Sequence, residues 1–186
     1  MTNIKALQWR YATKKFNPEK ILSSQKIDNK ELQEKLKSAS WNQQQLNTAS
    51  HVLVICIEKK VDKNFIEQYF KRVKHLRETP DEVLEPFKKS LVDSFESKAE
   101  EEVHAWALNQ AYLSLGTLLT VCATEEIDAC PMEGFEPDKY DELLNLEAHN
   151  LKSVLALPVG YRAEDDMFSE FKKVRRPLDE VIIEMN

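Results

Sequence analysis

Two basic segments of the chain could hold an anion such as a phosphate. Residues 10–15 read Arg-Tyr-Ala-Thr-Lys-Lys and place three cations directly after an expected short helix. Residues 172–177 read Lys-Lys-Val-Arg-Arg-Pro in a chain whose net charge is −6. Cationic side chains form strong charge-assisted hydrogen bonds to phosphate. Each segment also has a simpler interpretation, because cations favour a helix C-terminus and a basic tail can be merely solvated or serve as a localisation signal.

Two further segments could face a flat polar ring. Residues 41–45, Trp-Asn-Gln-Gln-Gln, carry amides that both donate and accept hydrogen bonds, although an Asn near a helix C-terminus beside a packed Trp is the simpler interpretation. Residues 131–135, Pro-Met-Glu-Gly-Phe, follow an expected buried strand, the position where α/β-type sheets present backbone amides to ligands. Gly134 would allow a flat ring to approach closely, and an ordinary turn is the alternative.

Several other chemistries are disfavoured by the sequence. The three glycines are too far apart to build the loops of Rossmann or P-loop proteins. The four histidines show no ligand spacing, which argues against a protein-bound metal. The three cysteines are odd in number and lack C-x-x-C spacing, which indicates reduced thiols in a cytoplasmic protein. An acidic surface disfavours nucleic acid as a partner, and the most apolar stretch, 111–123, is too short and too polar to span a membrane.

We expect a single α+β domain, residues 1–186, to position these segments. The chain is long enough to bury a core, with 42% hydrophobic and 31% charged residues. The apolar run 52–57, Val-Leu-Val-Ile-Cys-Ile, predicts a strand covered on both faces. Further strands are expected at residues 127–132, 153–161 and 181–185.

Helices are expected to dominate around this small sheet. Apolar spacing and N-terminal signals place them at residues 4–9, at 24–38, behind Asp62, from 79–82 onward, at 99–125 and from Pro137 onward. The 99–125 helix is apolar nearly all round from Trp106, so we expect it to be the central buried helix. The charged and then apolar stretch from Lys172 suits an arm that packs on another subunit.

Taken in chain order, these segments resemble the nitroreductase family of flavin-dependent oxidoreductases. The resemblance covers nearly the whole chain. It rests on W-R-Y-A-T-K-K-F at 9–16, W-N-Q-Q-Q at 41–45, T-A-S-H-V-L-V-I at 48–55, N-Q-A-Y-L-S-L-G at 109–116, I-D-A-C-P-M-E-G-F at 127–135, P-V-G-Y at 158–161 and K-V-R-R-P at 173–177. The R-Y-A-T-K-K-F and P-M-E-G-F pieces are fairly specific in combination.

The resemblance implies an FMN enzyme with a nitroreductase-like α+β fold. Its helices would surround a small mixed sheet with a long central helix, and a C-terminal arm would be exchanged in an obligate homodimer with the flavin at the subunit interface. By position, Arg10, Lys173 and Arg175 would hold the FMN phosphate. Lys14 would lie near flavin N1 and the C2 carbonyl, and Asn42 would bond the pyrimidine edge.

The other implied cofactor contacts are made mainly by the main chain. Tyr11 and Ala12 would line the ribityl side. The segment of Pro131 and Met132 leads to the backbone around Glu133 and Gly134, which would present an amide to flavin N5.

The implied reaction needs no catalytic side chain. NAD(P)H would pass hydride to the flavin and leave, and a nitroaromatic, quinone or similar acceptor would take its place in a ping-pong cycle. Residues between Phe65 and Phe95 would shape the acceptor pocket. This agrees with the lack of a Ser-His-Asp set or carboxylate pair in the sequence.

The chain departs from the family pattern near Asp28, Asn29 and Lys30. Family members carry there a Ser-Pro-Ser-Ser loop, a Gln-Pro-aromatic turn and a strand, so a few tens of residues are missing. Either the protein is shortened, or an intact mass above 21.6 kDa would show that a segment is omitted from the sequence as written. The loss removes flavin contacts and one strand, which supports the alternative of a non-catalytic flavin-binding or dimerising relative. A helical interaction domain unrelated to flavins is a separate alternative, and it requires all four segments described above to be surface features without a shared role.

Overall fold

A three-stranded antiparallel sheet forms the centre of the protein. The computed structural model describes residues 3–20 and 29–185. The strands lie in the order β1-β3-β2, and they are β1 (His51–Glu58), β2 (Asp128–Ala129) and β3 (Leu151–Gly160). A parallel bridge between Ala12 and Ala129 adds the N-terminal chain to the outer edge of β2.

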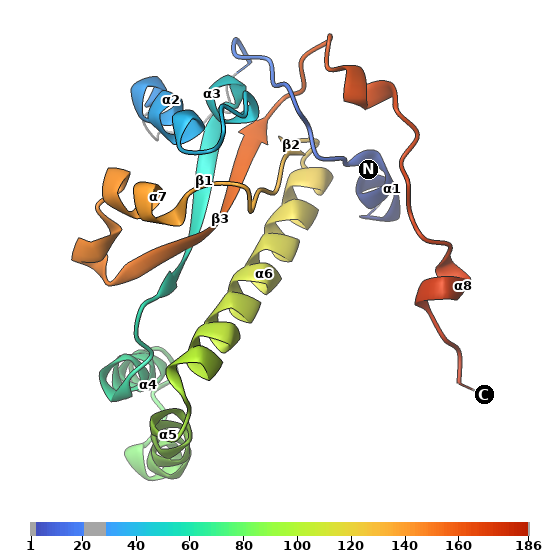
Figure 1. Ribbon diagram of the computed structural model, residues 1–186. Helices are drawn as coiled ribbons and strands as arrows, with labels where there is room; N and C mark the ends of the chain where they lie inside the picture. Colours follow the sequence, from blue (N-terminus) through green and yellow to red (C-terminus); the bar gives the residue numbers. More distant parts are fainter. Residues whose placement is uncertain (1–2, 21–28, 186) are drawn as a thin grey trace.

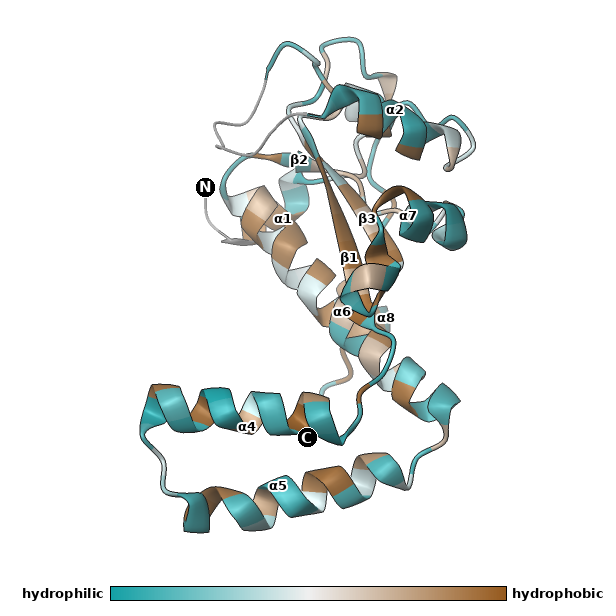
Figure 2. Ribbon diagram, turned by 90° about the vertical axis from the view of Figure 1, so that its left-hand side faces the viewer, coloured by the Kyte–Doolittle hydropathy of each residue, from teal (hydrophilic) through white to brown (hydrophobic). Residues whose placement is uncertain are grey.

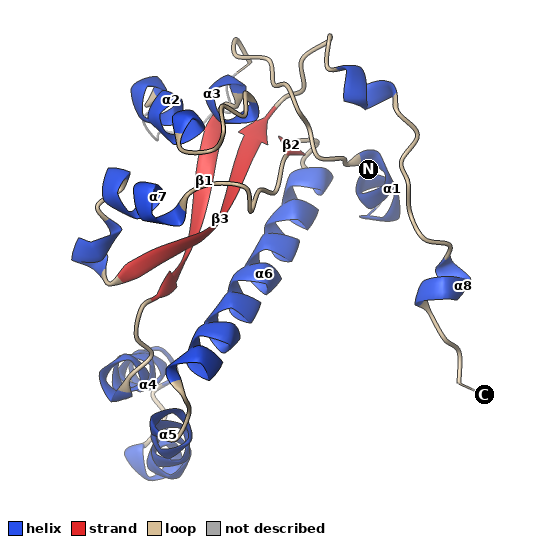
Figure 3. Cartoon of the chain, in the orientation of Figure 1, coloured by secondary structure: helices blue, strands red, loops and turns tan. Residues whose placement is uncertain are grey.

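Helices surround the sheet, as Figure 3 shows in blue. They are α1 (Asn3–Trp9), α2 (Lys30–Ser38), α3 (Gln45–Thr48), α4 (Lys63–Arg77), α5 (Asp81–Glu96), α6 (Glu100–Thr124), α7 (Pro137–Leu143), η1 (Leu146–His149), η2 (Met167–Glu170) and α8 (Leu178–Val181). The predicted cap of α4 is confirmed, because the Asp62 side chain accepts the Phe65 N–H at 2.9 Å. Asn29 caps α2 in the same way, and residues 24–28 of the helix expected at 24–38 lie outside the described residues.

The sheet separates two apolar cores because successive strand residues point to opposite faces. Leu155 and Leu157 of β3 pack with Ala111 and Leu115 of α6. Ala156, between them, joins the core on the other face. That second core is formed with α2, α3 and α7, which Figure 1 shows on the side of the sheet away from α6. For β1, the strand expected to be covered on both faces, Val52 and Val54 pack on one core and Ile55 and Ile57 on the other, although Leu53 is 40% exposed.

The long helix α6 is buried along one side and exposed along the other. Ala107, Ala111 and Leu115 face the sheet, whereas Leu113 is 67% exposed and Val121 is also exposed. The expected central helix exists, but in the single chain it is buried only along the side that faces the sheet. No helix in the described ranges 3–20 and 29–185 combines the length and hydropathy needed to cross a membrane.

Helices α4 and α5 form a hairpin at one end of the molecule, apart from the sheet (Figure 2). The hairpin has its own small core of Ile66, Phe70 and Val92. Phe70 also packs edge to face on Phe87, with ring centroids 5.7 Å apart. Helices α4 and α5 are therefore held together by an apolar core of their own, separate from the two cores on the sheet.

Two expected strands differ from the structure. The 127–132 strand is shortened to β2; beyond it, the Cys130 N–H donates to the Pro158 carbonyl at 3.0 Å and Met132 forms a bridge with Ala156. The strand at 181–185 is wrong: α8 ends at Val181, and the following residues are extended and exposed without a strand partner in the described chain. An apolar run needs a free sheet edge to become a strand, and this run lies beyond α1, away from the sheet (Figure 1).

Candidate functional site

Both ends of the chain meet at the C-terminal end of α1. Lys173 Nζ donates to the carbonyl oxygens of Gln8 and Trp9, at 2.7 and 2.6 Å. These are among the last carbonyls of α1, which have no partner inside the helix. The contact ties the basic C-terminal segment to Arg10, the residue that follows the helix.

Four cations gather at this point, and we call Arg10, Arg162, Lys173 and Arg175 the cation cluster. The pKa of Arg10 is lowered by burial and by the charge of Arg175. The pKa of Lys173 is lowered by burial and then by the three other members of the cluster, with Asp128 opposing the effect. Like charges that disfavour each other in this way form a site that a bound anion would stabilise.

Arg162 is held firmly, although its role was missed in the sequence. Its guanidinium forms a paired contact with the Asp128 carboxylate, with Nε at 3.0 Å and Nη2 at 2.6 Å from Oδ1. It also stacks on the rings of Trp9 and Tyr11, 4.5 and 4.7 Å from the centroids. Asp128 is 4% exposed. An aspartate inside the apolar run Ile-Asp-Ala-Cys was the available signal, because a buried carboxylate requires a cationic partner.

Asp166 fixes the main chain of the first basic segment. Its Oδ2 accepts the Tyr11 hydroxyl at 2.9 Å and the Lys14 N–H at 3.1 Å. Burial and the hydrogen bond to Asp166 raise the pKa of Tyr11 to about 12, so the hydroxyl stays protonated as a donor. With the bridge from Ala12 to β2, these contacts hold the 11–14 segment beside the sheet.

The Lys14 side chain points toward a buried thiol. Its Nζ lies 3.7 Å from Cys130 Sγ, and Cys130 is fully buried. Burial raises the pKa of this thiol although Lys14 opposes the shift. Cys56, Cys122 and Cys130 form no disulfide, as the sequence indicated.

The 131–135 segment leaves the sheet directly after Met132. Met132 exchanges two main-chain hydrogen bonds with Ala156, at 2.8 and 3.0 Å. The Glu133 carboxylate then accepts the hydroxyl of Tyr112 from α6 at 2.5 Å. Among the hydrogen bonds of residues 3–20 and 29–185, none uses the main-chain N–H of Glu133 or Gly134. Pro131, which has no N–H, precedes this pair of available donors.

Gly134 does admit a flat ring, but one such ring is supplied by this chain. A Cβ at Gly134 would lie 2.8 Å from Cζ3 of Trp41, so only glycine fits beside the indole. Trp41 and Asn42 both adopt left-handed backbone conformations, with φ of 51° and 58°. Asn42 is exposed on this turn, and the next residue, Gln43, donates to the Gly134 carbonyl at 2.9 Å.

The structure therefore brings the sequence-predicted residues into two groups near β2. One is the cation cluster with the Tyr11, Ala12 and Lys14 segment. The other is the 131–134 segment with the turn that carries Asn42. The two groups are linked through Lys14 and Cys130.

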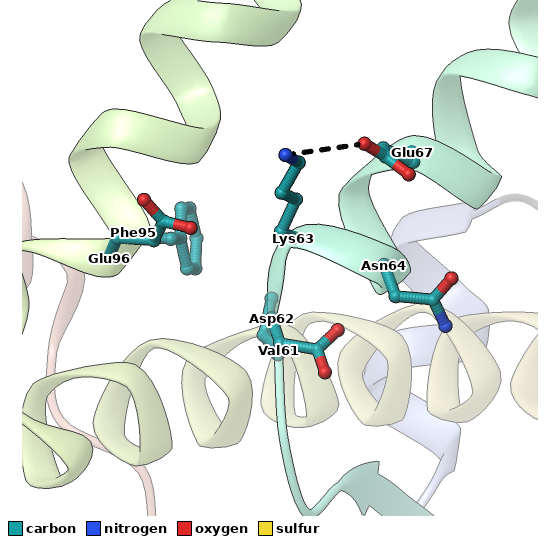
Figure 4. A pocket seen from close by; sticks show the side chains of 7 residues that line it. All are labelled: Val61, Asp62, Lys63, Asn64, Glu67, Phe95 and Glu96. Atoms are coloured by element: carbon teal, nitrogen blue, oxygen red, sulfur yellow. Dashed lines mark ion pairs between the residues drawn. The ribbon is translucent and has the colours of Figure 1, made fainter.

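A separate cavity of about 520 Å³ lies between the start of α4 and the end of α5. Figure 4 shows its lining, including the ion pair between Lys63 and Glu67. None of its lining residues belongs to the cation cluster or to the 131–134 segment. We therefore assign the candidate site to the residues around β2. The described residues contain no group of His, Cys, Asp and Glu that could hold a metal ion.

Comparison with known proteins identifies the family. The sequence pattern of the nitroreductase family matches residues 19–161. The chain belongs to the nitroreductase family. A relative from Staphylococcus haemolyticus, named "Putative NAD(P)H nitroreductase", is 33% identical over 214 residues, covering 97% of this chain and 96% of the relative. A Bacillus subtilis protein of the same printed description is 28% identical, covering 95% and 94% of the two chains.

Solved nitroreductases share the fold. The Bacillus subtilis protein ydfN superposes with a TM-score of 0.84 at 18% identity, covering 98% of both chains. A family member from Exiguobacterium sibiricum, solved in complex with FMN, gives 0.82 at 16% identity, covering 100% of this chain and 98% of that one. The 214-residue alignment to the Staphylococcus haemolyticus nitroreductase is longer than the 186 residues of this chain, so that relative carries residues that this nitroreductase lacks.

Proposed function

We propose that this nitroreductase is an FMN-dependent enzyme that takes hydride from NAD(P)H and passes it to nitroaromatic, quinone or similar acceptors in a ping-pong cycle. The observation that carries the proposal is the cation cluster. Arg10 comes from one end of the chain and Lys173 and Arg175 from the other, and besides burial the charge of Arg175 lowers the pKa of both Arg10 and Lys173. A phosphate ester of charge about −2 would relieve this repulsion.

The residues present fit FMN. Arg10, Lys173 and Arg175 would hold the phosphate, and Tyr11 and Ala12 would line the ribityl chain. Bound FMN supplies the hydride chemistry. Lys14 would stabilise negative charge on the pyrimidine side, where a cation about 4 Å away contributes about 4 kcal/mol at an effective dielectric of about 20.

The remaining contacts come from the second group of the site. Asn42 would bond the pyrimidine edge. The main-chain N–H groups of Glu133 and Gly134, which have no other acceptor among the described residues, would donate to N5. Trp41 would exclude water from one side of Gly134.

The enzyme's reduction can be observed directly. We expect the purified protein to show flavin absorbance that NADH or NADPH bleaches and that an added quinone restores. A protein that stays colourless under excess FMN would contradict the proposal. Bound flavin that neither nucleotide bleaches would favour the alternative of a non-catalytic flavin-binding relative, for which the residues missing relative to the family are the supporting observation.

We also propose that two copies form a homodimer, with FMN at the interface. The apolar side of α6 that faces solvent in the single chain supports this, as do exposed apolar residues of the C-terminal arm such as Ile183 and Met185. Large apolar side chains that gather on an exposed face are typical of an interaction site. The cation cluster lies at the base of this arm, so the partner subunit would cover it.

We expect Leu113→Glu to separate the dimer. A buried carboxylate without a partner costs several kcal/mol, which would shift the protein to monomers in light scattering after gel filtration. Leu143→Glu is the matched control, because Leu143 is an exposed leucine on α7, across the sheet from α6. An unchanged dimer in the Leu113 variant would place the interface elsewhere.

A further inference from the structure

A line of polar contacts joins the two groups of the candidate site. Gln43 Nε2 donates to the Gly134 carbonyl and Gln45 Nε2 donates to Gln43 Oε1, both at 2.9 Å. Gln45 is 4% exposed, and its side-chain amide acts on the Cys130 thiol, where it opposes the rise in pKa that burial causes. Cys130 Sγ is in turn 3.7 Å from Lys14 Nζ. The line therefore runs from the Gly134 main chain to the Lys14 ammonium.

The chemistry of the Gln43 amide fixes its direction in this line. The side chain must donate to the carbonyl of Gly134 and accept from Gln45 at the same time. A flipped amide would set oxygen against oxygen at one end and NH₂ against NH₂ at the other. The orientation of Gln43 and the position of the Gly134 carbonyl therefore determine each other.

The backbone bears a cost to bring Gln43 to this place. Trp41 and Asn42, which precede it, are both left-handed, a conformation that costs a non-glycine residue roughly 1–2 kcal/mol. The turn sets the Trp41 ring and the Gln43 amide against Gly134 together, since a Cβ there would be 2.8 Å from Trp41 Cζ3 and 3.2 Å from Gln43 Nε2. Such a conformation persists only where surrounding contacts fix it.

We infer that Gln43 is a positioning residue of the flavin site: it fixes the main chain at Gly134 and, through Gln45 and Cys130, couples it to Lys14. The inference rests on the proposed function, because it assigns the two ends of the line to two parts of the bound flavin ring. The contribution of Lys14 to FMN affinity then depends on which residue is present at position 43.

A double-mutant cycle tests this coupling. FMN dissociation constants are measured by quenching of flavin fluorescence for the parent, Lys14→Met, Gln43→Leu and the double variant. Gln43→Leu leaves the Gly134 carbonyl and the Gln45 amide without a partner, which raises the constant about tenfold. The dissociation constant of the double variant then differs at least about threefold from the value obtained by multiplying the two single effects. For independent sites the two effects multiply.

Gln44→Leu is the matched control, because Gln44 is the exposed neighbour whose side chain takes no part in the line. We expect it to change the dissociation constant less than about twofold and to multiply with Lys14→Met. Gln43→Met, of equal length and without an amide, replaces Gln43→Leu if the leucine variant does not fold.

A second measurement needs no flavin. In the FMN-free protein, amide hydrogen exchange of residues 132–136 becomes at least about threefold faster in the Gln43 variant and stays unchanged in the Gln44 variant. If the parent binds FMN, either of two results would overturn the inference but not the proposed function. One is that the effects of the two substitutions multiply, and the other is that amide exchange is unchanged in the Gln43 variant. A parent that binds no FMN would overturn the proposed function and the coupling with it.

Discussion

Replacing Arg10 and Arg175 together by methionine is expected to raise the FMN dissociation constant at least about a hundredfold. A hydrogen bond to a charged group contributes about 1.5–3 kcal/mol, and the variant removes two of the donors proposed to hold the phosphate. The measurement is a fluorescence titration at fixed ionic strength, because phosphate binding weakens with salt. The FMN-free variant should be no less stable than the parent, since Arg175 already disfavours the charge on Arg10.

The control for this variant removes the same charge elsewhere. Arg72 and Arg77 are exposed on α4, in the hairpin away from the cation cluster. Their joint replacement by methionine should change FMN affinity less than about twofold, because it removes only weak, screened electrostatics. If the Arg10 and Arg175 variant binds FMN as the parent does, the phosphate is held by other residues.

Asp128→Ala is expected to lower the free energy of unfolding by about 3–5 kcal/mol. The substitution leaves the Arg162 guanidinium, which lies over two aromatic rings and is 27% exposed, without its carboxylate partner. It removes more than one hydrogen bond between charged groups, and each such bond contributes about 1.5–3 kcal/mol. It also removes the acceptor of the Arg162 main-chain N–H at 2.8 Å. Urea unfolding followed by circular dichroism measures the change.

A surface aspartate separates this effect from a general loss of charge. Asp165 pairs with Lys15 at an exposed position, and exposed ion pairs contribute about 0–1 kcal/mol. Asp165→Ala should therefore stay within about 1 kcal/mol of the parent. An equal decrease in the free energy of unfolding in the two variants would mean that the contact of Asp128 with Arg162 stabilises the fold no more than an exposed ion pair does.

Local signals in the sequence were sufficient for most of the fold. The Asp62 cap and the 52–57 apolar run act on neighbours a few residues away, so the start of α4 and the position of β1 could be predicted. The strand expected at 181–185 shows the limit. The same apolar run would suit a strand of the sheet or an exposed segment that packs on another subunit, and composition does not distinguish these two structures.

The candidate site could be predicted only in part, for a related reason. The basic segments were visible as residue types, and the structure brings Arg10, Lys173 and Arg175 together. The contacts that hold them are long-range and specific. Arg162 meets a carboxylate 34 positions earlier, and Asp166 meets Tyr11 across 155 positions. Periodicity and capping carry no information about such pairs. A lone Asp in an apolar run does indicate that a buried carboxylate needs a cationic partner, but it does not say which residue that partner is.

The contact between Lys173 and the end of α1 has a consequence for synthesis. A ribosome delivers Arg10 long before Lys173 and Arg175, so the proposed phosphate site can assemble only after residue 175 has left the ribosome. Before that point Arg10 has neither Lys173 nor Arg175 beside it. If these three cations hold FMN as proposed, the cofactor would bind only after that point and would not guide the folding of the segments made earlier.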